Sequence, residues 1–252
     1  MCGRFVQKTP LGDIRVLFET TNPMPNAPPH YNAAPTQDLA VVRYNPASKA
    51  RSLDLLRWGL VPLWAKDPSF GARCINARAE TIVRATAFRQ AFERRRCLVP
   101  ADAFYEWQKR GCKTTQPYAI EPAGGEQAGG GLFAFAGLWE RWRNPSDGSI
   151  LRSFTIVTGE PNALCAPIHD RMPVILPPSA WPLWLGEAEA SPAELLELLQ
   201  PYPAELMRAY PIGAEVGNVK NDEPGLLDAT PENHQSLDLE CNEVPATMRR
   251  VR

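Results

Sequence analysis

The feature that most limits the fold of this chain is a series of short apolar segments, each bounded by proline or glycine. These segments are rich in β-branched and aromatic residues, which together with the flanking proline and glycine is typical of β-strands. They cover residues 53–62, 95–107, 117–122, 132–142, 152–161 and 171–177. No apolar run approaches the length of a membrane span.

Helical periodicity is clear in only three places, residues 9–20, 79–96 and 191–200. The strands alternate irregularly with these helices, which favours a mixed α+β domain over a doubly wound parallel sheet. We expect the glycine-rich segment 121–131 to form a hairpin loop between two strands. From about residue 225 onward no hydrophobic periodicity remains, which predicts a disordered tail.

The net charge of −1 hides a strong asymmetry along the chain. Residues 1–186 carry 22 basic and 15 acidic side chains, whereas residues 187–243 carry 2 basic and 13 acidic side chains. Of the 27 basic residues 21 are arginine, which suits bidentate contacts with phosphate, although a GC-rich genome would also enrich arginine. The positive balance of the first three-quarters favours an anionic partner.

Several classes of site are disfavoured by motif. The six cysteines include no C-x-x-C pair, so neither a disulfide framework nor a zinc site is expected. The chain also lacks a Walker loop, G-x-G-x-x-G, H-E-x-x-H and G-x-S-x-G. The N-terminus has no signal-peptide pattern, which predicts a cytoplasmic location. We expect a monomer that uses no metal or cofactor and does not engage a membrane.

Cys2 is the first candidate reactive residue. Removal of Met1 would leave Cys2 as the exposed first residue, with a free α-amine beside its thiol. The amine has an ordinary pKa of about 7.7–8.0, so part of it is neutral and nucleophilic near pH 7. It can form an imine with an aldehyde, and the thiol can then close a five-membered thiazolidine at high effective concentration.

Three other segments place a polar residue in an apolar or aromatic frame. Asn76 and Arg78 share a face of an extended chain, Glu106 lies between two aromatic residues, and His169 precedes an apolar strand. A carboxyl group held against aromatic rings should have a raised pKa and suit acid–base catalysis. Each also has an ordinary explanation: Asn76 as a helix cap, Glu106 as the partner of an arginine, and His169 as a loop residue.

Taken in order, eight segments resemble the blocks of the SOS-response-associated peptidase family. They are MCGRF, YNAAPTQ, RWGLVPLWA, INARAET, RCLVPADAFYEW, FAFAGLWE, FTIVT and IHDRMPVIL. The resemblance extends from Cys2 to about residue 226. It implies one compact α+β domain over residues 1–226, with a mixed, mostly antiparallel, barrel-like β core and a few helices. Residues 227–252 are then the expected tail.

The resemblance also implies a function, because members of this family shield or sense abasic sites in DNA. By this likeness Cys2 would form a thiazolidine with C1′ of the ring-opened sugar in single-stranded DNA. Asn76 would hold the Cys2 terminus, Glu106 would act as the acid–base, and His169 would move protons near the sugar. Seven further residues are expected to contact phosphates or bases: Arg4, Pro35, Trp64, Arg78, Trp107, Thr158 and Arg171.

Two other functions remain open on the sequence alone. Cys2 could be the nucleophile of an N-terminal cysteine peptidase, with His169 or the α-amine as base, and removal of Met1 could be its only proteolysis. Strand cleavage at the lesion, as by a lyase, could accompany capture. Alternatively, the chain could be a non-catalytic module that binds nucleic acid through its basic residues alone.

Overall fold

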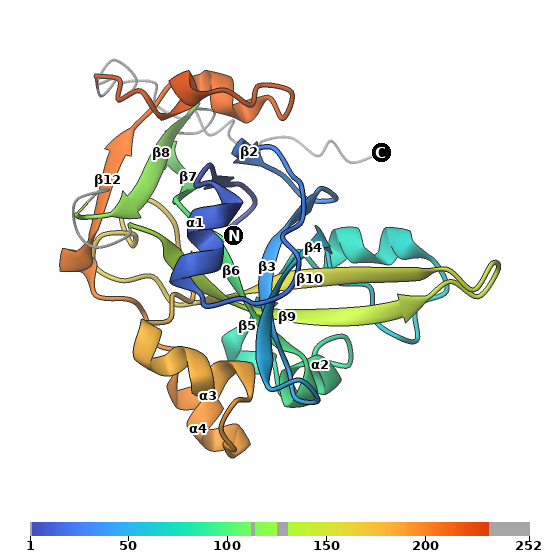
Figure 1. Ribbon diagram of the computed structural model, residues 1–252. Coiled ribbons are helices and arrows are strands. Elements are labelled where there is room, and N and C mark those ends of the chain that lie inside the picture. The colour runs from blue at the N-terminus through green and yellow to red at the C-terminus, as the bar shows by residue number, and fades with distance from the viewer. Residues whose placement is uncertain (1, 112–113, 125–130, 232–252) are drawn as a thin grey trace, which may run out of the picture.

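A closed five-stranded β-barrel forms the centre of the computed structural model, which describes residues 2–111, 114–124 and 131–231 (Figure 1). The strands pair in the order β10–β4–β3–β6–β9, and pairing of β9 with β10 closes the ring. Only the β4–β10 pair is parallel. The barrel strands are β3 (Asp38–Asn45), β4 (Ala50–Trp58), β6 (Arg96–Ala101), β9 (Phe133–Arg143) and β10 (Ile150–Gly159).

A second, antiparallel sheet lies beside the barrel, with strand order β12–β8–β7–β1–β2. Its strands are β1 (Phe5–Gln7), β2 (His30–Ala33), β7 (Ala103–Arg110), β8 (Thr114–Pro122) and β12 (Met207–Pro211). Two short strands add to β10 of the barrel: β5 (Asn76–Arg78) pairs in parallel and β11 (Met172–Pro173) antiparallel. The predicted α+β class with a mixed, mostly antiparallel, barrel-like core is therefore confirmed.

The helices are short. The α-helices are α1 (Leu11–Leu17), α2 (Arg89–Arg94), α3 (Trp181–Leu185) and α4 (Pro192–Glu197). The 3₁₀ turns are η1 (Pro68–Arg73), η2 (Ala79–Thr81), η4 (Pro178–Ala180), η5 (Ala204–Leu206), η6 (Ala214–Gly217) and η7 (Pro224–Leu227). Helix α4 begins as its sequence predicts, because Ser191 and Glu194 form a complete capping box around a proline at the first helical position.

One predicted helix was wrong. Residues 79–96 do not form a continuous helix: η2 and a series of turns precede α2, and β6 already begins at Arg96. The β-branched residues at 81–83 lose side-chain freedom in a helix and disfavour it. The apolar stripe still identified core positions, because Ile82 and Phe92 are both buried.

The predicted hairpin around residues 121–131 was also wrong. Strands β8 and β9 flank this segment but belong to different sheets and are not paired with each other in the part of the chain that is described. Residues 125–130 themselves lie outside the described residues. Strands β1, β2, β3 and β12 were not predicted from the sequence.

Alternate side chains of the barrel strands enter two different core clusters. Leu39 and Val41 of β3 belong to a cluster that includes Phe5 and Phe104 of the second sheet. The alternate residue Val42 belongs to a cluster covered by α1, α2, α3 and α4. Because successive side chains of a strand point to opposite faces, the barrel joins the second sheet to the helical layer.

A close backbone contact positions the segment that leads to β5. Gly59, at the end of β4, has a φ of 119°, and a Cβ atom there would lie 2.8 Å from the carbonyl oxygen of Gly71 in η1. Only glycine fits such an approach without strain. The amide of Leu60 also donates to the carbonyl of Cys74 (3.1 Å), so η1 is held against β4 and Asn76 follows at a defined place.

The C-terminal part of the described chain packs against the second sheet. Ala229 forms a β-bridge with Ile212, and the amide of Thr230 donates to the carbonyl of Pro211 (2.9 Å). The first residues of the predicted tail 227–252 therefore contact the fold. Residues 232–252 lie outside the described residues, and their disorder stays a prediction.

Candidate active site

Cys2 lies just before β1 and is fully buried, with 0% of its surface exposed. It packs in the core cluster that joins the second sheet to the barrel. The expectation that removal of Met1 exposes Cys2 stays a prediction, and in the full chain Cys2 is buried. Burial, and next the charge of Glu106, raise the pKa of the Cys2 thiol well above its usual range, which keeps the thiol protonated.

Asn76 contacts Cys2 directly. Its Nδ2 donates a hydrogen bond of 2.8 Å to the carbonyl oxygen of Cys2. Its Oδ1 is buried and, within the described part of the chain, has no hydrogen-bond partner. A buried polar atom without a partner is costly, so Oδ1 is a plausible acceptor for a ligand or for an amine formed at Cys2. The position on β5 excludes the helix-cap explanation for Asn76.

Glu106 reaches the same place from β7. The residue is 3% exposed, and burial raises the pKa of its carboxyl group to about 7. A carboxyl group with such a pKa can both donate and accept a proton near neutral pH. The sequence-based expectation of a raised pKa is confirmed, and its main cause is burial.

His169 completes this group from the loop before β11. Its Nε2 lies 3.8 Å from Oε2 of Glu106, and its Nδ1 accepts the backbone N–H of Arg171 at 3.0 Å. Burial lowers the pKa of the ring, which favours neutral imidazole with its proton on Nε2, facing Glu106. The exposed carboxylate of Asp170 also lies 2.9 Å from Nδ1. Because the backbone N–H of Arg171 can only donate, we assign Nδ1 as an unprotonated acceptor.

These four residues, Cys2, Asn76, Glu106 and His169, are hereafter called the Cys2 cluster. They come from the N-terminal segment, β5, β7 and the loop before β11. The structure brings these residues together in two contacting pairs: Asn76 bonds the Cys2 carbonyl, and His169 lies 3.8 Å from Glu106. The arrangement offers a donor to the Cys2 carbonyl oxygen and a buried carboxyl group that faces a half-buried imidazole ring.

Three of the residues predicted to contact DNA lie along the adjoining end of β10. Arg78 is exposed on β5, directly opposite Thr158. Thr158 Oγ1 is buried without a hydrogen-bond partner among the described residues. Arg171 donates to both carboxylate oxygens of Glu80 (2.6 and 3.0 Å) and to the carbonyl of Thr158 (2.6 Å). A DNA phosphate could bind Arg171 only by sharing or replacing its hydrogen bonds with Glu80 and Thr158.

Arg4 is held by the protein itself. Its guanidinium group donates to Asn32 Oδ1 (2.9 Å) and to the carbonyls of Val216 (3.0 Å) and Gly217 (3.2 Å). These bonds attach η6 to the second sheet. The expected phosphate contact by Arg4 therefore competes with a structural role.

The three predicted stacking residues differ in exposure and in what they contact. Trp64 is 54% exposed and meets the ring of Phe70 edge-on, with 4.9 Å between ring centroids. Pro35 is half-buried in the turn after β2. Trp107 follows Glu106 on β7, so its side chain points to the opposite face and packs with a third apolar cluster.

Two residues next to the Cys2 cluster were not predicted from the sequence. The backbone N–H of His169 donates to the carbonyl of Cys165 (2.9 Å), and burial, followed by the charge of Glu106, raises the pKa of the Cys165 thiol to about 12. The only available signal was its position four residues before His169. Glu80 was missed as the partner of Arg171, although it lies two residues after Arg78 in the same segment.

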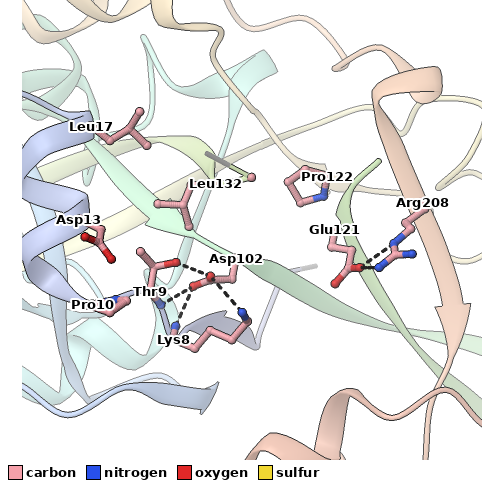
Figure 2. Close-up of a pocket in the computed structure, with 11 residues that line it drawn as sticks. Lys8, Thr9, Pro10, Asp13, Leu17, Asp102, Glu121, Pro122, Leu132 and Arg208 are labelled. Carbon is pink, nitrogen blue, oxygen red and sulfur yellow. Dashed lines mark hydrogen bonds and ion pairs between the residues drawn. The ribbon is translucent and has the colours of Figure 1, made fainter. Parts of the chain in front are cut away.

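A cavity of about 470 Å³ opens elsewhere, between α1 and the ends of β8 and β12 (Figure 2). Asp102 lies on one side of it, bonded to Lys8 and Thr9, and the ion pair of Glu121 with Arg208 lies on the other. None of the predicted site residues lines this cavity. In the same described part of the chain, no group of three metal-ligating side chains converges, and no helix is long and apolar enough to cross a membrane.

Comparison with known proteins gives consistent matches. A family model described as SOS response associated peptidase (SRAP) matches residues 1–219. The abasic site processing protein YoqW of Bacillus subtilis is 42% identical over 231 residues, which cover 91% of this chain and 100% of that protein. The abasic site processing protein HMCES of Gallus gallus is 34% identical and matches over 79% of this chain and 66% of its own length.

Solved structures agree in fold. A crystal structure of a protein from Bacteroides thetaiotaomicron superimposes with a TM-score of 0.81 over 91% of this chain and 100% of that chain, at 23% identity. A protein from Bordetella bronchiseptica gives a TM-score of 0.70 at 28% identity, over 84% of this chain and 100% of its own.

Proposed function

Because the chain belongs to the SOS response associated peptidase (SRAP) family, we propose that it processes abasic sites in single-stranded DNA. In this proposal Cys2, freed by removal of Met1, captures the lesion as a covalent adduct that shields it. The observation that carries the proposal is the Cys2 cluster itself. A carboxyl group with a pKa near 7 and a neutral histidine lie together beside an N-terminal cysteine whose carbonyl is held by Asn76.

The chemistry starts from the ring-opened aldehyde of an abasic sugar. The α-amine of Cys2 adds to C1′, and loss of one water gives an imine. The Cys2 thiol then adds to the same carbon, and its proton passes to the imine nitrogen, so that a C–S bond closes a thiazolidine. No oxidant or reductant is needed. Only one water is lost overall.

Glu106 is the general acid and base in this sequence. Protonated, it donates to the hydroxyl group that leaves as water; ionised, it takes the proton of the Cys2 thiol. His169 holds its Nε2 proton toward the same carboxyl group and relays protons between Glu106 and the sugar oxygens. The buried Oδ1 of Asn76 accepts a hydrogen bond from the amine formed after Met1 is removed.

DNA binding is expected to depend on backbone and stacking contacts, since an abasic site has no base to read. Arg78 and Arg171 supply phosphate contacts together with Thr158, which is the strand partner of Arg78 and accepts a bond from Arg171, and Arg4 supplies a further contact. Trp64, Pro35 and Trp107 supply apolar faces for bases. Affinity should therefore fall with rising salt but vary little with sequence.

The peptidase alternative gains less support from the site. A cysteine peptidase attacks through a thiolate, and burial works against that form by raising the pKa of the Cys2 thiol. A thiol that closes onto a neighbouring imine needs only a base at the moment of attack. Glu106 is placed near enough to influence the charge of Cys2 and can supply that base.

The test uses single-stranded DNA with one abasic site, analysed by denaturing gel and intact mass spectrometry. We expect a complex that survives denaturation, with the mass of the protein lacking Met1 plus the DNA minus one water. Cys2→Ala should abolish it, and acetylation of the Cys2 α-amine should abolish it with the thiol still free. Absence of a covalent product from the unmodified protein would refute the proposal; turnover of a peptide library by that protein would favour the peptidase.

A further inference from the structure

The β9–β10 hairpin carries a cluster of positive charge that the Cys2 cluster does not use. Its two strands project beyond the rest of the barrel and end in a turn on the right of Figure 1. Arg141 and Arg152 are direct partners in the pairing of β9 with β10, and Arg143 is opposite Ile150, two pairs closer to the turn. All three arginines are exposed and share one face of the hairpin, because they lie at alternate positions of their strands. We call this the arginine face.

This arrangement opposes sheet stability. Like charges directly opposite each other in neighbouring strands are destabilising, and Arg143 is a diagonal neighbour of Arg152 at roughly 7–8 Å. In the described parts of the chain, none of the three guanidinium groups forms an ion pair. Two carboxylates of the same hairpin are engaged elsewhere: Glu140 lies on the opposite face and accepts from Arg95, and Asp147 in the turn accepts the backbone N–H of Ser149.

The hairpin that carries the arginine face is well supported. On its opposite face Trp142 is buried and donates a hydrogen bond of 2.7 Å to the carbonyl of Ala65. At the turn, the amide of Asn144 donates to the carbonyl of Ser149 (2.8 Å). Toward the barrel, Trp139 continues the arginine face and stacks under the guanidinium of Arg43, 4.3 Å from the ring centroid. The positive charges therefore stand on a rigid platform beside an aromatic ring.

We propose that the arginine face is a second nucleic-acid contact, which binds phosphates of the abasic DNA strand away from the lesion. That this ligand is the abasic strand rests on the proposed function. Arg152 is six positions before Thr158 on β10, and Thr158 is the strand partner of Arg78. At the rise of a β-strand the two places are roughly 20 Å apart. That distance corresponds to about six nucleotides of a stacked strand at ~3.4 Å each.

The test compares two lengths of single-stranded DNA. A strand of about 5 nucleotides centred on the abasic site is too short to reach the arginine face, whereas one of about 25 nucleotides is long enough. The variants are the triple substitution of Arg141, Arg143 and Arg152 to glutamine and the matched triple substitution to lysine, which keeps the charge. Binding is measured without cross-linking, over a range of salt concentrations, on the Cys2→Ala background.

The affinity for the long strand falls with salt, and in the glutamine variant the slope of log affinity against log salt should be shallower by about 2. Each of the three lost phosphate contacts to single-stranded DNA contributes about 0.7 to that slope. At about 0.1 M salt this is a loss of affinity on the order of 10- to 100-fold. The lysine variant should keep the slope, and all proteins should bind the short strand alike. Relief of the like-charge pair predicts an equal or higher melting temperature for the glutamine variant.

An unchanged slope for the glutamine variant would overturn the proposal, and so would an equal loss of affinity on the short strand. If the triple variant does not fold, Arg152→Gln alone should lower the slope by about 0.7 on the long strand only. Covalent capture of the short abasic strand by these variants with Cys2 intact should match the parent protein. Failure of the parent protein itself to capture that strand would refute the proposed function and leave the salt dependence as the test of the arginine face.

Discussion

Replacement of Glu106 by glutamine tests the central physical claim about the Cys2 cluster. The substitution keeps the shape of the side chain and removes the charge that burial disfavours. Burial raises the pKa of Glu106 to about 7, whereas an unfolded glutamate has a pKa of about 4.3. A carboxyl group whose pKa is raised by folding binds its proton more tightly in the folded state. At a pH below its pKa in the unfolded chain, the group is protonated in both states and does not change the free energy of unfolding. At a pH above its pKa in the folded protein, the buried charge lowers the free energy of unfolding by the full amount.

The size of this penalty follows from the difference between the two pKa values. It develops between about pH 4 and pH 7 and reaches about 4 kcal/mol at higher pH, at ~1.4 kcal/mol for each unit of pH. Glu106→Gln should therefore raise the free energy of unfolding by about 4 kcal/mol relative to the parent at pH 8.5 and change it little at pH 4.5. The 3% exposure of the side chain leaves little solvent screening to reduce this value.

Chemical denaturation at the two pH values measures the difference, and single-turnover capture on a denaturing gel measures the chemistry. Capture by Glu106→Gln should be slower by a factor on the order of 10²–10⁴, the usual range for loss of a general acid–base. Glu93→Gln is the matched control: it removes an exposed carboxyl group and measures the effect of a glutamate-to-glutamine change that involves no burial. A Glu106→Gln effect on stability that is the same at both pH values, or capture at the parent rate, would refute the reasoning.

Three other substitutions probe the neighbourhood of the cluster. Asn76→Ala removes the hydrogen bond to the Cys2 carbonyl and should slow capture about 5-fold, as expected for ~1 kcal/mol, in the same gel assay; an unchanged rate would contradict a positioning role. Glu80→Gln and Arg171→Lys should be non-additive by roughly 0.2–1 kcal/mol in a double-mutant cycle of stability, because the bidentate pair is partly exposed; additive effects would argue against coupling. Gly59→Ala should lower the free energy of unfolding by about 2 kcal/mol or more, because the backbone has a positive φ and a carbonyl lies 2.8 Å from the new Cβ; a melting temperature equal to the parent would contradict this.

The sequence by itself determined the local features whose causes are local. The cap of α4 follows from a serine, a proline and a glutamate within four residues, and four of the five barrel strands follow from short apolar runs between prolines and glycines. The sequence also indicated a raised pKa for Glu106, although the tertiary structure supplies its cause by burying the carboxyl group. The family blocks singled out Cys2, Asn76, Glu106 and His169, which are distant in sequence; in the structure Asn76 bonds the Cys2 carbonyl and His169 faces Glu106, and their shared role stays a prediction.

Tertiary structure alone decided which strands pair and which side chains are free. Strands β8 and β9 look like the arms of a hairpin in sequence, but each finds a better-matched partner in a different sheet. Arg4 and Arg171 look like free phosphate ligands in sequence, but carbonyls and carboxylates from distant segments hold both. Cys2 is expected to be exposed and reactive from its position in the sequence, but it is buried, because β1 carries it into the core. Such contacts are non-local, so no window of sequence contains their energies; they exist only once the chain has closed the barrel.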